Sequence, residues 1–296
     1  MARRFFIIHN PVAGRRRHWL LTETVQELSA RGCLVTVQVT QRSGDAIALA
    51  REASDADVVL AAGGDGTVGE VVHGLMTRPD GDTPDFATIP LGTINVLALE
   101  TGLPKTPAQL AGVLAEGPAS QLTVGRANGR YFLLTAGAGT DAAAVGFLSP
   151  TLKKFLGQGA YYIALVQTLI REGNTVYDVV LDAGEGEQTF TVSSVIVTNA
   201  SRYGGPKVIV PEARLDDGKL HVLLGMSHGR WNLTRYGLAY MRGKFFTLPD
   251  VRIIPVTKLR VAAPAGKPVQ LDGDVVLSLP IDIEVAPQRL GVIVSG

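Results

Sequence analysis

The sequence predicts an α/β N-terminal doubly wound domain followed by a C-terminal antiparallel β-sandwich-like domain, and two patterns lead to this fold class. Up to Ser120, short apolar runs alternate with helical patterns. Such alternation requires right-handed crossovers between the strands of a mostly parallel sheet. Beyond Ser120, short strand patterns are joined by turns rich in Gly, Asp and Pro, which is typical of antiparallel sheets.

The first half pairs an expected strand with an expected helix four times. The strands cover residues 5–8, 34–39, 58–62 and 87–91, and the helices contain residues 21–28, 47–53, 68–75 and 96–101. The first and third strands are wholly apolar, as in strands buried on both faces of a sheet. Leu21, Val25 and Leu28 recur at helical spacing, and Gly32 follows as a C-cap.

The second half begins with a hairpin signal, Asn128-Gly129, between two alternating strands. Further strands are expected at residues 176–181, 190–199, 220–224, 251–254, 259–262, 269–271 and 281–285, with helices at 152–170 and 231–242. We therefore assign residues 1–121 to the first domain and residues 122–285 to the second. Residues 286–296 are a candidate segment to return to the first domain.

The composition is that of an ordinary globular protein, with 46% hydrophobic and 19% charged residues. A formal net charge of +1 gives no global attraction to nucleic acid, so we expect no nucleic-acid partner. Cys33 is the only cysteine, which fits a reducing compartment. No apolar run approaches the roughly 18 residues of a membrane-spanning helix, and the N-terminal run is too short for a signal peptide. We expect a cytoplasmic protein that meets lipid only peripherally, at the inner face of the membrane.

A glycine-rich loop at residues 63–67, Gly-Gly-Asp-Gly-Thr, lies between an expected buried strand and the start of a helix. Its glycines let the backbone turn sharply and bring N–H groups close to an anion, while the helix N-terminus adds positive potential. Asp65 among these amides would repel a phosphate unless a divalent cation or a transferable proton were present. The loop therefore predicts phosphoryl transfer with Mg²⁺ and not passive nucleotide storage.

Other interpretations of this loop fit less well. An ordinary turn between strand and helix does not need three glycines in four positions. Gly64, Gly66 and Gly69 satisfy the G-x-G-x-x-G dinucleotide fingerprint, but the loop follows the third strand, and no acidic residue ends the next one. A P-loop is excluded because no Lys-Ser or Lys-Thr follows the glycines.

The positions of the histidines in this chain argue against two further enzyme classes. Residues 225–229 fit the G-x-S-x-G motif of serine hydrolases, but the only histidine after Ser227 is the adjacent His228, which is unable to swing back onto it. A zinc enzyme is disfavoured because the five histidines show no metal-ligand spacing and the single cysteine stands alone.

Short motifs at fixed spacing cover nearly the whole chain. They are Asn-Pro-Val-Ala-Gly at 10–14, Thr40 with Gly-Asp-Ala at 44–46, the glycine loop with Glu-Val-Val at 70–72, Pro-Leu-Gly-Thr at 90–93 with Asn95, Ala-Gly-Ala-Gly at 136–139 with Asp141, Asp-Gly-Lys-Leu at 217–220, and Leu-Asp-Gly-Asp at 271–274. In this combination the sequence resembles the diacylglycerol kinase catalytic family, which includes bacterial lipid kinases and sphingosine kinases and is related to NAD kinases. The family's fold, an α/β nucleotide-binding domain and a β-rich domain for the lipid acceptor with ATP in the interdomain cleft, agrees with the two patterns described above.

The resemblance implies ATP and Mg²⁺ as cofactors, together with a set of site residues. The residues that would bind or surround ATP are Asn10, Gly14, Thr40, Gly63, Gly64, Asp65, Gly66, Thr67, Glu70, Gly92, Thr93 and Asn95. The metal site would use the Asp217 side chain with the main-chain carbonyls of Arg214 and Lys219, and a plain β-turn is the alternative for this segment. Asp141 would contact the polar head of the acceptor. The three arginines at 15–17 would either hold phosphate or form a solvated cluster.

The general base is open between Asp65, Asp272 and Asp274. A lipid hydroxyl loses its proton as it attacks the γ-phosphoryl group, so a carboxylate within hydrogen-bond reach is needed. Family members usually carry Asp-Gly-Glu where this chain has Asp-Gly-Asp. Because Asp274 is shorter than glutamate by one methylene, Asp272 becomes the more attractive base of the two, and an Asp-Gly hairpin turn is the alternative.

We expect an ATP- and Mg²⁺-dependent lipid kinase with diacylglycerol as the acceptor. A sphingoid-base or ceramide kinase, an NAD kinase-like enzyme and a non-catalytic nucleotide-binding regulator stay open. Gly69 and His73 stand where asparagine is common in the family, and Val96 replaces the aspartate that often follows Asn95. The expected partners are the lipid acceptor and, transiently, a membrane surface, through basic and aromatic residues at 147–170 and 235–246. Core packing is the alternative explanation for these two segments. A homodimer is also left open.

Overall fold

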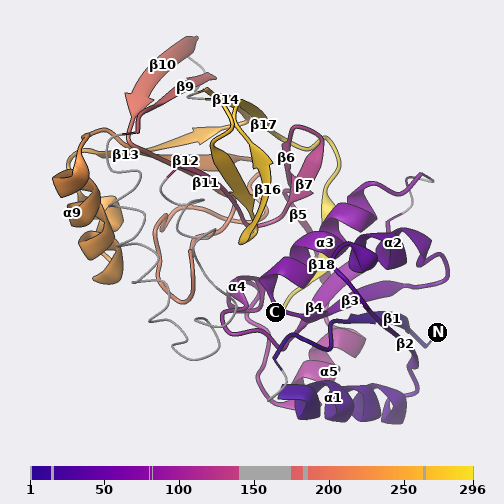
Figure 1. Ribbon diagram of the computed structural model, residues 1–296. Helices are drawn as coiled ribbons and strands as arrows, with labels where there is room; N and C mark the ends of the chain where they lie inside the picture. Colours follow the sequence, from indigo (N-terminus) through magenta and orange to yellow (C-terminus); the bar gives the residue numbers. More distant parts are fainter. Residues whose placement is uncertain are drawn as a thin grey trace. The chain divides into compact units, whose positions relative to one another are not determined.

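The computed structural model describes residues 2–14, 17–79, 81, 83–139, 175–182, 186–262 and 265–295. The chain forms two compact units, Met1–Val124 with Pro287–Gly296, and Gly125–Ala286 (Figure 1). The first unit is α/β and the second is built mainly of strands, as the sequence predicts. The helix expected at 152–170 lies outside the described residues.

The sheet of the first unit has the strand order β2-β1-β3-β4-β18-β5. Its strands are β1 (Arg4–His9), β2 (Leu34–Val39), β3 (Val58–Gly63), β4 (Asp85–Pro90), β5 (Ala119–Leu122) and β18 (Leu290–Ile293). Strands β1 to β4 and β18 run parallel, and β5 pairs antiparallel to β18. The mostly parallel sheet is thereby confirmed, and a segment near the end of the chain supplies one of its strands.

Helices cover both faces of this sheet (Figure 1). They are α1 (His18–Ala30), α2 (Asp45–Glu52), α3 (Asp65–Met76), α4 (Val96–Glu100) and α5 (Pro107–Glu116). Helix α1 packs with α5 on one face, where Leu28, Leu110 and Leu114 join the buried core. Helix α2 packs with α3 on the other face, so closely that a Cβ at Gly74 would lie 2.5 Å from the carbonyl oxygen of Ile47.

The strand order indicates where this unit binds a ligand. From β1 the chain crosses to β2 on one side, and it later returns to β3 on the other side. The loops that follow β1 and β3 therefore diverge, and open α/β sheets bind ligands at the carboxyl ends of their strands where this happens. The described parts of these loops are residues 10–14, Arg17 and Gly64, so the glycine loop lies at the edge that the topology favours.

The second unit stacks two antiparallel sheets around one core. Their orders are β10-β9-β14-β17-β6-β7 and β13-β12-β11-β8-β15-β16. The strands are β6 (Gly125–Ala127), β7 (Arg130–Phe132), β8 (Thr135–Gly139), β9 (Tyr177–Asp182), β10 (Glu187–Val192), β11 (Ser194–Thr198), β12 (Leu220–Gly225), β13 (Val251–Val256), β14 (Lys258–Ala262), β15 (Pro268–Leu271), β16 (Asp274–Ser278) and β17 (Ile281–Val285). Phe132 and Tyr177 of one sheet meet Val222 and Leu224 of the other in the core, as expected for a β-sandwich.

The single strand predicted at residues 190–199 is wrong. The structure has two strands there, β10 and β11, and they belong to different sheets. Ser193 separates them: it is buried, and its hydroxyl donates to the carbonyl oxygens of Gly225 at 3.2 Å and Ser227 at 2.7 Å. The hydroxyl thus pairs with main-chain groups at the corner where the chain changes sheets. Strand-forming residues on both sides of Ser193 hide this break in the sequence.

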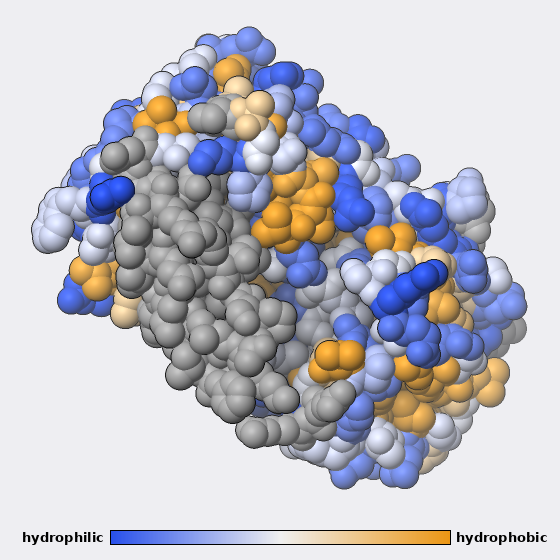
Figure 2. Space-filling model, in the orientation of Figure 1, coloured by the Kyte–Doolittle hydropathy of each residue, from blue (hydrophilic) through white to orange (hydrophobic). Residues whose placement is uncertain are grey.

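Two hairpins of the second unit turn on residues with positive φ. Asn128 and Gly129 connect β6 to β7 with φ of 44° and 82°, which confirms the predicted hairpin. Asp272 and Gly273 connect β15 to β16 in the same way, with φ of 49° and 92°. The sequence did not predict β16, an edge strand on which Val275 and Val276 are exposed. Figure 2 shows an apolar patch in the region where Figure 1 draws β16. The sequence also did not predict the strands β5, β8 and β18, which are short or rich in Gly and Ala, or the helix α5.

Helix α9 (Arg230–Met241) confirms the helix expected at 231–242, and the short 3₁₀ helix η2 (Phe245–Thr247) follows it. Leu233 and Tyr236 of α9 pack with Phe245 and with residues of β11 and β12 in a separate apolar cluster. Arg235 of α9 forms an ion pair with Asp250, and the Tyr236 hydroxyl donates to the same carboxylate at 2.7 Å. Within the described ranges, none of the helices has both the length and the apolarity that crossing a bilayer demands.

The carboxylate of Asp250 makes the free energy of unfolding of the second unit vary with pH in the acidic range. Burial alone would raise its pKa, but hydrogen bonds from Arg235, Ser227 and Tyr236 outweigh burial and lower the pKa from 3.8 to about 2. The ionised group therefore stabilises the fold at and above its ordinary pKa, and this contribution is lost as the pH falls toward 2. Because solvent screens the partly exposed pair, we expect a contribution of about 1 kcal/mol.

Urea denaturation followed across this pH range measures the contribution. Asp250→Asn keeps the size of the side chain but removes its charge, so its free energy of unfolding should depend less steeply on pH between about 4 and about 2 than that of the native chain. The same slope in both proteins would contradict this assignment.

Candidate functional site

The N-terminus of α3 presents main-chain amides at the carboxyl edge of the first unit's sheet. Strand β3 ends at Gly63, Gly64 is the N-cap, and the first intrahelical bond runs from the Val68 N–H to the Gly64 carbonyl. The N–H groups of Gly66 and Thr67 precede that bond, and no side chain in the described part of the chain caps the helix. Amides in this position, with the positive end of the helix dipole, form a binding site for an anion.

A hydrogen bond links this helix to the loop after β1. Asn10 donates from Nδ2 to Thr67 Oγ1 at 3.1 Å, and its Oδ1 accepts the N–H of Val12 at 3.1 Å. Thr67 also explains one glycine, because a Cβ at Gly63 would lie 2.4 Å from Thr67 Oγ1. Asn10, Gly63 and Thr67 therefore meet in one place, as expected for neighbours in a binding site.

The loops after β1, β3 and β4 touch through their backbones. Gly14 has φ of +58°, and a Cβ on it would lie 1.7 Å from the carbonyl oxygen of Leu91. A Cβ on Gly92 would lie 2.6 Å from the Cα of Gly64. Side chains would separate these loops, so the close approach at this edge depends on glycine.

Asp65 holds the loop after β4 in place. Its carboxylate accepts the N–H groups of Asn95 at 3.1 Å and Val96 at 2.8 Å, at the start of α4. Asn95 has φ of +56° and donates from Nδ2 to the Gly92 carbonyl at 2.8 Å. These two amide donors face the Asp65 carboxylate and stabilise its negative charge. The structure thus gives Asp65 a positioning role, and its catalytic role stays a prediction.

The Asn95 side chain carries an unusual acceptor. Asn95 is 8% exposed, and within the described residues its Oδ1 is buried without a hydrogen-bond partner. A Cβ at Gly92 would lie 2.7 Å from this oxygen, so Asn95 Oδ1 borders the contact between the two glycine loops. A buried unpaired amide oxygen is costly, and a donor from a bound ligand would satisfy it.

Three other predicted ligands lie on neighbouring loops. Thr40 follows β2, is buried, and donates its N–H to the His9 carbonyl at 2.9 Å. Glu70 accepts the Ser43 hydroxyl at 3.1 Å and the Gly44 N–H at 3.0 Å through Oε1, which fixes the loop after β2 against α3. Thr93 is exposed beside Gly92.

The arginine cluster is described only in part. Arg17 donates from Nη1 to the Gly92 carbonyl at 2.9 Å, so its guanidinium lies at this edge, while Arg15 and Arg16 lie outside the described residues.

The histidine at the base of the first loop is held in its neutral form. Burial lowers the pKa of His9; the carbonyl of Ala62, 3.4 Å from Nδ1, opposes this effect, and His18 adds to it. The two imidazole rings lie 5.0 Å apart. At neutral pH, His9 therefore adds no charge to the edge that would receive phosphate.

In the second unit, Asp272 is the best-anchored of the predicted bases. It is 4% exposed, and its carboxylate accepts the N–H groups of Leu133 at 2.8 Å, Leu134 at 2.8 Å and Thr135 at 2.9 Å. Three donors occupy most of the acceptor capacity of a carboxylate. The exposed Asp274 follows directly at the start of β16.

Gln270 supports the same turn and was not predicted. It is 1% exposed, and its Oε1 accepts the N–H of Gly273 at 2.8 Å. The signal in the sequence is a single glutamine inside an apolar strand, Val269-Gln270-Leu271, where a buried amide needs a specific partner.

The predicted metal turn offers main-chain and carboxylate oxygens. Asp217 Oδ1 accepts the N–H of Lys219 at 2.9 Å, and the Asp217 N–H donates to the Arg214 carbonyl at 3.4 Å. The turn thereby brings the predicted donors into one short loop, and hard oxygen donors are the kind that Mg²⁺ takes. Among the described residues, no group of three or more His, Cys, Asp or Glu side chains is placed to hold a metal, so carbonyl oxygens would have to complete such a site. Asp141 lies outside the described residues.

Comparisons with known proteins cover both units. The profile of the diacylglycerol kinase catalytic domain matches residues 4–127, and that of the YegS C-terminal NAD kinase beta sandwich-like domain matches residues 135–294. The chain is 28% identical to diacylglycerol kinase of Bacillus subtilis (strain 168) over 274 residues, which are 90% of this chain and 88% of that protein. It is 28% identical to diacylglycerol kinase of Staphylococcus carnosus (strain TM300) over 295 residues, 99% of this chain and 95% of that protein. A crystal structure of a diacylglycerol kinase from Bacillus anthracis str. Sterne has a TM-score of 0.76 at 25% identity, covering 99% and 97% of the two chains.

Gly14→Ala tests whether backbone contact shapes the site. A side chain at residue 14 would combine left-handed strain with the clash against Leu91, so we expect a loss of about 2–4 kcal/mol in unfolding free energy. Gly32→Ala is the matched control, since φ there is +78° but nothing lies within 4 Å, and it should cost only about 1 kcal/mol of strain. Urea denaturation compares the two variants, and equal losses would refute the contact.

Asp272→Asn tests the anchoring of the hairpin turn. Asparagine tolerates the positive φ, but its NH₂ group would face a buried main-chain N–H, so we expect a loss of about 1–3 kcal/mol. The exposed Asp274→Asn should change stability by less than about 0.5 kcal/mol. Thermal or urea unfolding measures both, and a neutral Asp272→Asn would show that the three amide bonds contribute little.

Proposed function

The chain belongs to the lipid kinases that join a diacylglycerol kinase catalytic domain to a YegS-type C-terminal domain, and on that premise we propose that it transfers the γ-phosphoryl group of ATP to the hydroxyl of diacylglycerol. It is a phosphotransferase with an alcohol group as acceptor. Family membership supports the reaction class, and we propose ATP as the donor and diacylglycerol as the acceptor.

The observation that carries the proposal is the N-terminus of α3 with its surroundings. Uncapped amides at Gly66 and Thr67 point from the carboxyl edge of a parallel sheet, where the strand order reverses. Glycines at 14, 63, 64 and 92 keep side chains away from this edge. Such a surface suits a chain of phosphates that approaches the backbone directly, which is how ATP would be held.

Mg²⁺ would enter with ATP and neutralise charge on its phosphates. A separate ion fits the turn at residues 214–219, where the Asp217 carboxylate and the carbonyls of Arg214 and Lys219 would hold it. An ion there would tie the turn before β12 together, which is a structural contribution.

The carboxylates divide into two that hold loops and one that is exposed. Asp65 holds the start of α4 through two amides, and Asp272 holds residues 133–135 through three. We assign the general base to Asp274, because it is exposed and the turn at Asp272 fixes its position. It would take the proton from the lipid hydroxyl as that oxygen attacks the γ-phosphorus, while the leaving oxygen stays on ADP.

Diacylglycerol is favoured over NAD as the acceptor. The relatives that align along most of the chain are named diacylglycerol kinases. An NAD kinase would be expected to place an acidic side chain after Asn95 for its acceptor, but Val96 stands there and is 7% exposed, within the core. An apolar buried side chain has no group with which to recognise a ribose hydroxyl.

A transfer assay with labelled ATP and Mg²⁺ against diacylglycerol, sphingosine, ceramide and NAD tests the proposal. We expect labelled phosphatidate from diacylglycerol, no transfer when EDTA removes the metal, and a loss of at least about 100-fold in turnover for Asp274→Asn with its stability retained. Transfer to another acceptor alone would replace diacylglycerol. Binding of ATP without any transfer would favour a regulator.

A further inference from the structure

The outward face of α9 carries large apolar side chains that are exposed. Trp231, Leu238 and Met241 are 79%, 42% and 38% exposed. They recur at positions i, i+7 and i+10, so they lie along one side of the helix. The inward side, with Leu233 and Tyr236, is buried against the sandwich. Both sides of this helix are therefore partly apolar. Packing against the sandwich explains the inward side only.

The inward contacts fix the direction of the outward face. Arg235 pairs with Asp250, the Tyr236 hydroxyl accepts the Ser227 N–H at 2.9 Å, and the Tyr240 hydroxyl donates to the Tyr203 carbonyl at 2.8 Å. These bonds tie successive turns of α9 to the body of the second unit. Rotation of the helix to bury Trp231 would break them, so the exposed apolar side chains are held outward.

The charge around this face has one sign. Residues 230–248 contain four basic residues and no Asp or Glu, although the whole chain has 28 basic and 27 acidic residues. The ion pair with Asp250 neutralises Arg235. Arg242 and Lys244 are exposed, and no ion pair within the described residues involves either of them. Two cations without an ion-pair partner among the described residues thus lie at the C-terminal end of the apolar stripe.

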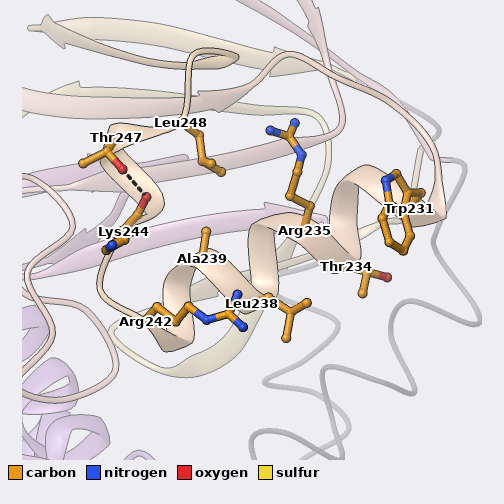
Figure 3. A pocket seen from close by; sticks show the side chains of 9 residues that line it. All are labelled: Trp231, Thr234, Arg235, Leu238, Ala239, Arg242, Lys244, Thr247 and Leu248. Carbon is orange, nitrogen blue, oxygen red and sulfur yellow. Dashed lines mark hydrogen bonds between the residues drawn. The ribbon is translucent and has the colours of Figure 1, made fainter.

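A pocket of about 280 Å³ lies between α9 and the segment that follows it (Figure 3). Arg242 and Lys244 border it together with Thr247, and Trp231 and Leu238 continue along the helix. Cationic and hydroxyl groups thus lie beside apolar ones on one surface. A bilayer with anionic headgroups presents the complementary arrangement, with phosphates above acyl chains.

We propose that the outward face of α9 docks on the surface of an anionic phospholipid bilayer, with Trp231 and Leu238 in the interfacial region and Arg242 and Lys244 on headgroup phosphates. The proposal deepens the proposed function, because it names the surface from which a lipid kinase would reach its substrate. A second copy of the chain fits less well, since two such faces would bring like charges together.

Fluorescence of Trp231 tests the docking directly. The chain has two tryptophans, so Trp19→Phe leaves Trp231 as the only one. In this background, vesicles of phosphatidylcholine with phosphatidylglycerol should shift the emission to the blue, and brominated acyl chains should quench it. Vesicles of phosphatidylcholine alone should do neither, and added salt should weaken the binding.

Charge reversal supplies the matched comparison. Arg242→Glu with Lys244→Glu should lower partition into anionic vesicles by at least about tenfold. Lys105→Glu with Lys258→Glu changes the net charge equally at exposed positions elsewhere, and should lower partition by less than about threefold, because salt screens distant charges. All four substituted side chains are exposed, so the folds should be retained.

The outcomes separate this proposal from the kinase assignment. Vesicle binding is measured without ATP, and turnover is measured on diacylglycerol in neutral detergent micelles, where the α9 variant should match the native chain. The docking surface would be overturned if the two double variants partitioned equally into anionic vesicles. It would also be overturned if the Trp231 emission shifted at a higher protein concentration without vesicles. Absent turnover in micelles with intact vesicle binding would overturn the kinase assignment instead.

Discussion

The carboxylate of Asp65 is the constraint on which the geometry of the first unit's binding edge depends. It belongs to the first turn of α3, and it accepts two amides at the start of α4. One negative charge therefore faces the positive ends of two helices, where it is stabilised by both. The loops after β3 and β4 also touch through Gly64 and Gly92, so they form one continuous surface.

In the second unit, too, an aspartate carboxylate accepts several main-chain amides. Asp272 leaves β15 in a left-handed conformation and turns its carboxylate back onto three amides at residues 133–135, directly before β8. Strand β8 is rich in glycine and alanine and lies between β11 and β15. Side chains on this strand contribute little packing, so hydrogen bonds from the flanking turn help to fix it. In both units, an aspartate next to glycine acts first on the backbone.

Sequence patterns predicted what depends on local chemistry. Wholly apolar runs predicted the parallel strands, and Asn128-Gly129 predicted a hairpin, because both signals lie within a few residues. The break at Ser193 was missed because no Gly or Pro marks it, and its partners Gly225 and Ser227 lie more than thirty residues away. The contact of Asp65 with the N–H groups of Asn95 and Val96 was missed for the same reason, since nothing in the sequence shows that the amides of a later loop reach it. The role of Asp65 beside a cation stays a prediction.

The departure at Val96 shows why a site built on the backbone tolerates substitution. The family often has aspartate at this position, and its loss raised the question of altered nucleotide contacts. Here the group that Val96 contributes is its N–H, which Asp65 accepts at 2.8 Å, while its side chain is buried. Any residue except proline supplies that N–H. The glycines differ, because a Cβ at residue 14 or 92 would enter a neighbouring backbone. The shape of this edge therefore depends on the glycines and on Asp65, whereas the residue at position 96 contributes through its backbone.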